Sequence, residues 1–277
     1  MAEVRRMRPL LGTYVEVGAR GSRPRLERAV EAAFECLQRA HARWSFHDPD
    51  SELTRFNRSG TQPLALHPQT LRLLRIAHAL MLRSGGRFNC TVGGLLVRRG
   101  VLPDHGGDYI DVGEAGDLEL GAAGARLRRP LRLTLDGIAK GYAVDLAVGT
   151  LKRQGARAGW VNAGGDLRVF GDLALPVHRR EPDGRMQALG ILREAAVATS
   201  QRKAGGLGDD RCPGCIVAPP DLRAADAAGV WTVLARSAWR ADALTKVAAN
   251  AGDAADRAVA SLGGRLVTPA VPGGPAS

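Results

Sequence analysis

Residues Leu135–Asp145 read Leu-Asp-Gly-Ile-Ala-Lys-Gly-Tyr-Ala-Val-Asp, and they lie where a predicted strand passes into a predicted helix. The extended segment Leu131–Leu135 predicts the strand, and the helix is expected from Gly137 to Gln154. The N-terminus of a helix exposes unpaired N–H groups and carries a partial positive charge. Because Lys140 lies in the first turn, this helix start suits a phosphate or pyrophosphate group.

Helix and strand patterns extend in both directions from this stretch. Apolar residues three and four apart predict further helices at Pro24–Trp44, Pro68–Arg83 and Ala238–Asn250. Further strands are predicted at Leu11–Val17, Tyr109–Val112, Leu118–Leu120, Ala158–Asn162, Leu167–Phe170, Gln187–Leu192, Ala196–Thr199, Ile216–Ala218, Val230–Ala235 and Leu262–Thr268. A loop is expected at Gly171–Asp183. Strands alternate with helices but also follow one another directly, which favours an α+β fold with mixed sheets and packed helices.

The length of 277 residues, without a clean linker, predicts a single domain of two interlocked halves at residues 1–268. Residues 269–277 are rich in Pro, Gly and Ala and are expected to form a flexible tail. No apolar run approaches the ~18 residues that span a bilayer, so no membrane span is expected. No secretory signal is visible before Leu11, which predicts a cytoplasmic protein, or a periplasmic one if an upstream leader was removed.

The composition is that of a globular protein with an excess of positive charge. Hydrophobic residues make up 45% and charged residues 24% of the chain, which excludes wholesale disorder. The net charge of +11 raises the question of a nucleic-acid partner. Most of the cations are arginines that stand singly or in pairs, and aromatic residues, at 4%, leave few rings for base stacking. We therefore expect no nucleic-acid partner.

Several conspicuous residues have ordinary structural interpretations. The pair Cys212 and Cys215 has no second cysteine pair with which to hold zinc, and a tight turn with two incidental thiols is favoured. His78 lies on a predicted helix, where a core or boundary position is favoured over a ligand role. Asp50 or Ser51 is expected to cap a helix.

Three further motifs place reactive residues at the ends of predicted elements. Arg87–Gly94 contains small residues that let backbone approach a ligand closely, although a plain strand entry explains it equally well. Asn162–Asp166 reads Asn-Ala-Gly-Gly-Asp at the end of a strand. Asp242 and Thr245 lie three apart on one helix face and offer oxygen ligands of the kind that magnesium takes. Taken alone, each motif is more often an ordinary surface than a site.

The order of these motifs resembles the ApbE family, the FAD:protein FMN transferases. The resemblance spans Leu11 to Asn250, and it is carried by Leu11–Thr13, Ser51–Leu53, Thr91–Gly93, Gly137–Asp145, Asn162–Asp166 and Ala241–Leu244. It implies an α+β fold with two interlocked halves around a flavin cleft. It also implies an enzyme that moves FMN from FAD onto a Thr or Ser hydroxyl of a flavin-accepting protein, with Mg²⁺ as helper and release of AMP.

The same resemblance implies roles for individual residues. The backbone carbonyl of Gly137, the carboxylate of Asp242 and the hydroxyl of Thr245 are expected to hold Mg²⁺. Asp136 and Asp242 are the expected catalytic residues. The residues expected to border FAD are His47, Phe88, Asn89, Cys90, Thr134, Lys140 and Ile216.

Three departures from the family pattern leave a second hypothesis open. The family's His-Ile-Ile-Asp-Pro segment, whose histidine is a candidate base, is replaced here by Cys-Ile-Val-Ala-Pro from Cys215 onward. Lys246 stands four residues after the metal aspartate, where the family commonly has threonine. An aspartate expected near the central motif falls on Thr134, with Asp136 as its substitute. The alternative is therefore a catalytically weakened relative that binds flavin as a carrier, a scaffold or an FAD pyrophosphatase.

Overall fold

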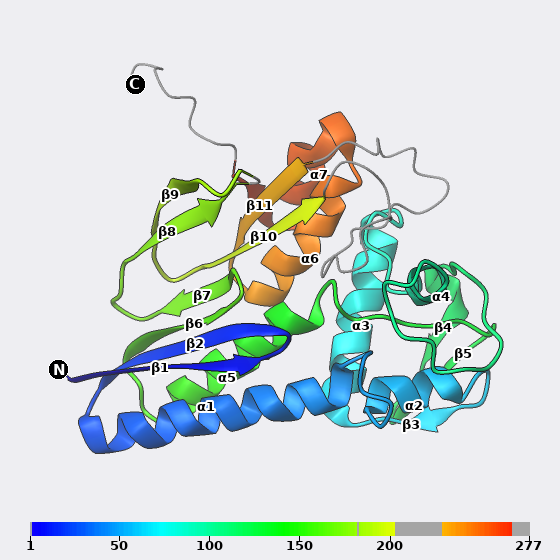
Figure 1. Cartoon of the computed structure of the whole chain (residues 1–277), viewed down its shortest axis with the longest axis horizontal. Coiled ribbons are helices and arrows are strands. Elements are labelled where there is room, and N and C mark those ends of the chain that lie inside the picture. Colours follow the sequence, from blue (N-terminus) through cyan, green and yellow to red (C-terminus); the bar gives the residue numbers. More distant parts are fainter. Residues whose placement is uncertain (1, 182, 203–228, 268–277) are drawn as a thin grey trace.

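A seven-stranded sheet forms the centre of the computed structural model, which describes residues 2–181, 183–202 and 229–267 (Figure 1). Its strands, in spatial order, are β1 (Ala2–Leu10), β2 (Thr13–Gly21), β6 (Ala158–Ala163), β7 (Asp166–Phe170), β10 (Ala196–Arg202), β11 (Gly229–Ala235) and β12 (Gly264–Leu266). Every neighbouring pair is antiparallel. The predicted α+β class is confirmed. The strand directions are antiparallel rather than mixed, in keeping with the short turns that join β1 to β2 and β6 to β7.

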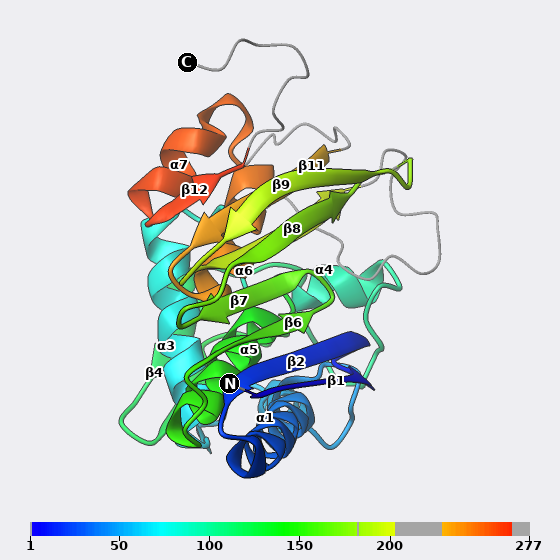
Figure 2. The same cartoon turned by 90° about the vertical axis from the view of Figure 1, so that its left-hand side faces the viewer.

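The described residues form seven α-helices: α1 (Arg23–Trp44), α2 (Glu52–Arg58), α3 (Pro68–Arg83), α4 (Gly93–Arg98), α5 (Ala139–Arg153), α6 (Ala238–Ala249) and α7 (Ala255–Ser261). Short 3₁₀ turns occupy Ala115–Asp117 and Gly252–Ala254. Helices α1, α5 and α6 pack against one face of the sheet (Figure 2). Within the described ranges, no helix is both long and apolar enough to cross a membrane.

The opposite face of the sheet is covered by a hairpin of β8 (Leu175–Arg180) and β9 (Met186–Leu192) (Figure 2). Alternate residues of β6 serve the two faces. Trp160 belongs to a small apolar cluster that includes Leu192 of the hairpin, whereas Val161 belongs to the main core under the helices.

A second part of the molecule contains α2, α3, α4 and a three-stranded sheet in the order β3-β5-β4 (Figure 1). Its strands are β3 (Leu64–Ala65), β4 (Leu118–Leu120) and β5 (Gly124–Leu127). The main apolar core includes Val15 of the large sheet, Leu71 of α3 and Leu127 of β5, so both parts share one continuous core. Segment 128–138 leads from the second part into α5, and it brings the central sequence motif to their junction.

Local signals explain where the helices begin. Helix α3 has the predicted bounds because Pro68 fits a first turn, where its missing N–H costs nothing. Helix α2 begins after Ser51, whose Oγ accepts a hydrogen bond from the Thr54 N–H at 3.0 Å. The expected capping role of Ser51 is thus confirmed.

Two predicted strands are wrong, and side-chain hydrogen bonds explain one of them. The amide of Asn57 bonds both the N–H and the carbonyl of Leu133 at 2.8 and 2.9 Å. On the backbone of the same segment, the Thr134 N–H bonds the Cys90 carbonyl at 2.9 Å, and the Arg132 carbonyl accepts from the Gly93 N–H at 3.0 Å. Leu131–Leu135 is therefore satisfied by a side chain and two isolated backbone bonds, and it belongs to no sheet. Tyr109–Val112 is likewise outside any sheet, and its Ile110 N–H bonds the Pro130 carbonyl at 2.8 Å.

Other boundaries differ from the prediction. The sheet begins with β1 rather than at Leu11, because Leu11 and Gly12 form the turn to β2 at φ values of 57° and 69°. The expected loop Gly171–Asp183 contains β8. The predicted strand Ile216–Ala218, the cysteine pair Cys212 and Cys215, and the tail 269–277 lie outside the described residues.

Candidate functional site

The N-terminus of α5 packs closely against the start of α6. A Cβ atom on Gly141 would lie 2.4 Å from the carbonyl oxygen of Ala238, so only glycine permits this approach. Asp145, one turn further along α5, accepts hydrogen bonds from the N–H groups of Ala238 and Trp239 at 2.9 and 3.0 Å. Ser237 at the N-cap of α6 makes no side-chain cap, so Asp145 performs that function from another helix.

Asp242 of α6 makes the reciprocal contact with α5. Its side chain is 1% exposed, and its Oδ2 accepts a hydrogen bond from the Gly141 N–H at 3.1 Å. A carboxylate placed at a helix N-terminus is stabilised by the helix dipole and satisfies an orphan N–H group. Asp242 is therefore held at the helix start that the sequence marks as an anion site.

Lys246 occupies the other side of the Asp242 carboxylate. Its Nζ forms an ion pair with Asp242 Oδ1 and lies 3.2 Å from the Asp242 backbone oxygen. The stem of Lys246 runs along Gly137, where an added Cβ would be 3.6 Å from the lysine Cε. The Lys246 ammonium thus lies between Asp242 of α6 and Gly137 of the motif Leu135–Asp145.

Thr245 faces away from this carboxylate. Its hydroxyl donates to the Asp242 backbone oxygen at 2.6 Å and lies 2.7 Å from the Ser200 Oγ of β10. The residue is fully buried between α6 and the sheet. The side chains of Asp242 and Thr245 therefore do not converge on one point as their spacing predicts.

Lys140 and Asp166 form a second charged pair beside Asp242. The Lys140 Nζ lies 3.4 Å from Asp166 Oδ2, a buried oxygen that has no partner in hydrogen-bond geometry. Burial raises the pKa of the Asp166 carboxyl to about 7, the nearby charge of Asp242 adds to this rise, and Lys140 opposes it. The Asp166 charge in turn raises the pKa of Lys140 above its ordinary value. Lys140 therefore stays a cation at this site.

Asp136 lies at the entrance to α5 with its side chain exposed to solvent. Packed protein around it still desolvates the carboxyl and raises its pKa, while Thr134 and the charges of His47 and Lys246 oppose this rise. Thr134 Oγ accepts a hydrogen bond from the Asp136 N–H at 3.3 Å. Asp136, Thr134 and the exposed His47 therefore gather near Lys246, as their shared electrostatic interactions show.

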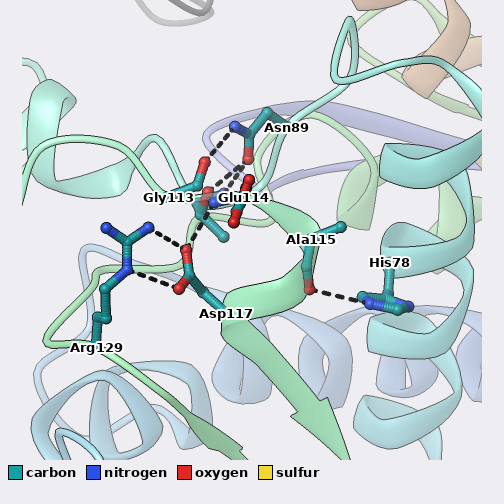
Figure 3. A network of polar contacts seen from close by, with 8 residues as sticks. His78, Asn89, Gly113, Glu114, Ala115, Asp117 and Arg129 are labelled. Carbon is teal, nitrogen blue, oxygen red and sulfur yellow. Dashed lines mark hydrogen bonds and ion pairs between the residues drawn. The ribbon is translucent and has the colours of Figure 1, made fainter.

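The turn Phe88-Asn89-Cys90 contributes mainly by shaping the site. Phe88 is buried, and its ring edge would meet a Cβ on Gly137 at 3.3 Å. The Asn89 amide donates to the Gly113 carbonyl at 3.0 Å (Figure 3). Its oxygen accepts from the Thr91 N–H at 2.8 Å. Burial raises the pKa of Cys90 to about 12, so its side chain is a neutral core group.

The loop that Asn89 holds is fixed by further polar contacts. Arg129 and Asp117 form an ion pair, and Asp117 Oδ2 accepts from the Glu114 N–H at 2.9 Å (Figure 3). His78 Nε2 lies 3.1 Å from the Ala115 carbonyl oxygen. His78 is half-buried, at the boundary position that the sequence predicts. The side chain of Asn89 has a structural role, because it bonds the backbone of the same loop.

The structure thus brings most of the predicted site residues together at one helix junction. His47, Phe88, Thr134, Asp136, Gly137, Lys140 and Asp242 lie there, whereas Ile216 is outside the described residues. Three further residues have defined positions in the site, Asp145, Asp166 and Lys246, although the sequence motifs that contain them predict no role for them. The spacing of Asp242 and Lys246, four apart on a helix, is a signal for their ion pair.

The residues present do not fit the magnesium site that the resemblance implies. Thr245 is turned toward Ser200, and an ammonium is already paired with the Asp242 carboxylate. A second cation beside Asp242 would repel the ammonium of Lys246.

Comparisons with known proteins agree with this fold and motif set. The model of the ApbE family matches residues 11–266. The FAD:protein FMN transferase of Vibrio cholerae is 31% identical over 147 residues, a match that covers 49% of this chain and 44% of that relative. The match therefore spans less than half of the relative's length.

Solved structures show the same architecture. The ApbE protein of Thermotoga maritima superposes with a TM-score of 0.83 at 22% identity, covering 96% of this chain and 93% of that one. The flavin transferase ApbE of Vibrio cholerae gives a TM-score of 0.70 at 24% identity, with 89% and 86% of the two chains covered. The apo flavinyl transferase ApbE of Pseudomonas stutzeri gives 0.71 at 21% identity, with 92% and 88% covered. With a family match from the first hairpin to the last strand, this chain belongs to the ApbE family.

Proposed function

We propose that this protein is an FAD:protein FMN transferase that moves FMN from FAD onto a threonine or serine hydroxyl of a flavin-accepting protein. The family match and the transferase relative of Vibrio cholerae support this proposal. The observation that carries it is the junction of α5 and α6, where Lys140 and Lys246 place two ammonium groups beside a helix N-terminus. Such a helix start with lysines suits a diphosphate.

The proposed reaction is a phosphoryl transfer. The acceptor hydroxyl oxygen attacks the phosphorus of the FMN half of FAD, and the bond from that phosphorus to the bridging oxygen breaks. AMP leaves with the bridging oxygen, and the hydroxyl proton is released. Positioning and neutralisation of charge do most of the catalysis in such reactions, and the two lysines supply both.

Asp136 is the proposed proton acceptor for the incoming hydroxyl. It is exposed at the entrance to α5, and its raised pKa makes it a stronger base than an ordinary aspartate. His47, which interacts with Asp136, and Phe88, which lies against Gly137, are the proposed neighbours of the flavin. Thr134 accepts a hydrogen bond from the backbone N–H of Asp136. The magnesium ion implied by the resemblance is left out of this proposal because Lys246 occupies the position beside Asp242.

The test is an incubation of the purified protein with FAD and a substrate protein that carries a Thr or Ser flavin-acceptor sequence. We expect the intact mass of the substrate protein to rise by one FMN group, together with release of one AMP for each adduct. A reaction without FAD is the control. Tight FAD binding with no adduct, in buffer with either MgCl₂ or EDTA, would instead favour a flavin carrier.

A further inference from the structure

The position of Lys246 relative to Asp242 and Gly137 has a consequence for the cation requirement of the site. The family pattern combines a carbonyl at Gly137, a carboxylate at Asp242 and a hydroxyl four residues later. Here the residue four positions later is a lysine whose ammonium is paired with that carboxylate and whose stem lies along Gly137. We propose that the Lys246 ammonium takes the place of a divalent cation at the FAD diphosphate, an inference that rests on the proposed function.

The hydrogen-bonding capacity of Lys246 supports this role. An ammonium has three donors. Two of its contacts go to the Oδ1 and the backbone oxygen of Asp242, so one donor remains for a phosphate oxygen. The side chain is 20% exposed, which leaves that donor access to a bound ligand.

The surroundings fix the ammonium at this place. Asp242 is itself fixed by the Gly141 N–H, so the carboxylate that holds Lys246 is attached to the start of α5. Lys140 lies in the first turn of the same helix and is paired with Asp166. The diphosphate would therefore contact two lysine ammonium groups and a helix N-terminus. All of this positive charge comes from the protein chain itself and none from a bound metal ion.

Two measurable consequences follow. FAD binding should not depend on an added divalent cation, because the positive charge is covalently attached to the protein. Replacing Lys246 by the family's residue, Lys246→Thr, should remove that charge and free the Asp242 carboxylate. FAD binding should then become dependent on Mg²⁺.

The test compares FAD affinity, measured by quenching of flavin fluorescence, in EDTA and in MgCl₂. We expect the same Kd in both buffers for the wild-type protein. For Lys246→Thr we expect a loss of at least about tenfold in EDTA, which MgCl₂ restores, since a hydrogen bond to a charged group is worth about 1.5 to 3 kcal/mol. Lys152→Thr, which removes an exposed lysine at the far end of α5, is the matched control and should behave like the wild type.

The outcomes separate this inference from the proposed function. Wild-type binding that weakens at least about tenfold in EDTA would overturn the role of Lys246 and leave the transferase proposal standing. Wild-type protein that binds FAD in neither buffer would overturn the proposed function itself. Lys246→Thr that binds FAD in EDTA as the wild type does would also overturn the inference.

A second measurement needs no variant, in case Lys246→Thr does not fold. Mn²⁺ is titrated into the wild-type protein saturated with FAD, and free Mn²⁺ is followed by electron paramagnetic resonance. We expect no more Mn²⁺ to be bound than by FAD alone at the same concentration. One tightly bound Mn²⁺ for each protein–FAD complex would contradict the proposal.

Discussion

Asp145 and Asp242 are reciprocal caps, because each carboxylate accepts hydrogen bonds from the N-terminal N–H groups of the helix that carries the other. Asp145 of α5 caps α6 at Ala238 and Trp239, and Asp242 of α6 caps α5 at Gly141. Both side chains are largely buried. The arrangement fixes the two helices in register, and it thereby fixes the distance between the lysines that they carry.

We predict that Asp145→Ala destabilises the protein by about 2 to 4 kcal/mol, because it leaves two N–H groups of α6 and the Arg168 guanidinium without their shared partner. Urea unfolding measures this loss. The matched control is Glu35→Ala, since Glu35 and Arg39 form an exposed pair at 3.6 Å that should contribute little. Equal stability of the two variants would contradict the capping role of Asp145.

A second prediction concerns the close approach of the two helices. Gly141→Ala should destabilise the protein by about 1 to 3 kcal/mol, because its Cβ would lie 2.4 Å from the rigid backbone at Ala238. Gly149→Ala in the same helix is the control. Its Cβ would meet only the end of the Arg153 side chain, at 3.2 Å, so higher helix propensity should leave stability unchanged or improved. The midpoints of thermal unfolding of the two variants test this prediction. Equal midpoints would contradict the close approach of the helices at Gly141.

The buried Asp166 carboxyl predicts a pH dependence of stability. Its pKa is raised by burial from 3.8 to about 7, so the folded state holds a proton that the unfolded state releases. This carboxyl should therefore lower the free energy of unfolding as the pH rises through that interval. Asp166→Asn removes the titration, and urea unfolding across the same interval should show a flatter pH profile for the variant. Parallel profiles would rule out the raised pKa.

The placement of Thr245 predicts that its hydroxyl is structural. Thr245→Val should lower stability by about 1 kcal/mol through loss of the bond to Ser200, and it should leave the Kd for FAD unchanged in MgCl₂. Fluorescence titration with FAD tests the second part. A weaker Kd in MgCl₂ alone would show instead that Thr245 acts as a metal ligand, as its spacing from Asp242 suggests.

The proposed base gives a prediction about activity. Asp136→Asn should keep FAD affinity but lower the rate of FMN transfer by about 10²- to 10⁴-fold, the usual contribution of a general base. Because Asp136 is exposed, the variant should fold like the wild type, which circular dichroism can verify. If the variant transfers FMN at the wild-type rate, a group other than Asp136 accepts the proton of the acceptor hydroxyl.

Much of the fold could be predicted because its signals are local. The bounds of α3 follow from Pro68 and a regular apolar stripe, and the turn at Gly164 and Gly165 separates β6 from β7 as expected. Strand β1 is not predicted from the sequence because it is an edge strand with charged residues at Glu3, Arg5 and Arg6, so it lacks a clear apolar face. The predicted strand at Leu131–Leu135 is wrong because the segment bonds the side chain of Asn57 and isolated backbone groups of Cys90 and Gly93, about which the local pattern carries no information.

In the site too, local features could be predicted from the sequence, whereas contacts between distant residues could not. The motif around Lys140 marks a helix start that is visible within eleven residues of sequence. The partner of Asp145 lies 93 residues away, and that of Gly141 lies 101 residues away, so only the folded chain shows the reciprocal caps. The spacing from Asp242 places Thr245 on the same helix face, and the family resemblance implies that its hydroxyl is a metal ligand. Its hydroxyl instead bonds the carbonyl of its own helix and Ser200 of the neighbouring strand.

The most direct test of this account is a crystal structure of the protein with FAD, grown in the presence of MgCl₂. The account predicts that the diphosphate lies at the start of α5, with phosphate oxygens within hydrogen-bond distance of the Lys140 and Lys246 Nζ atoms. An FAD molecule whose diphosphate lies elsewhere, with Lys246 still paired only to Asp242, would contradict it.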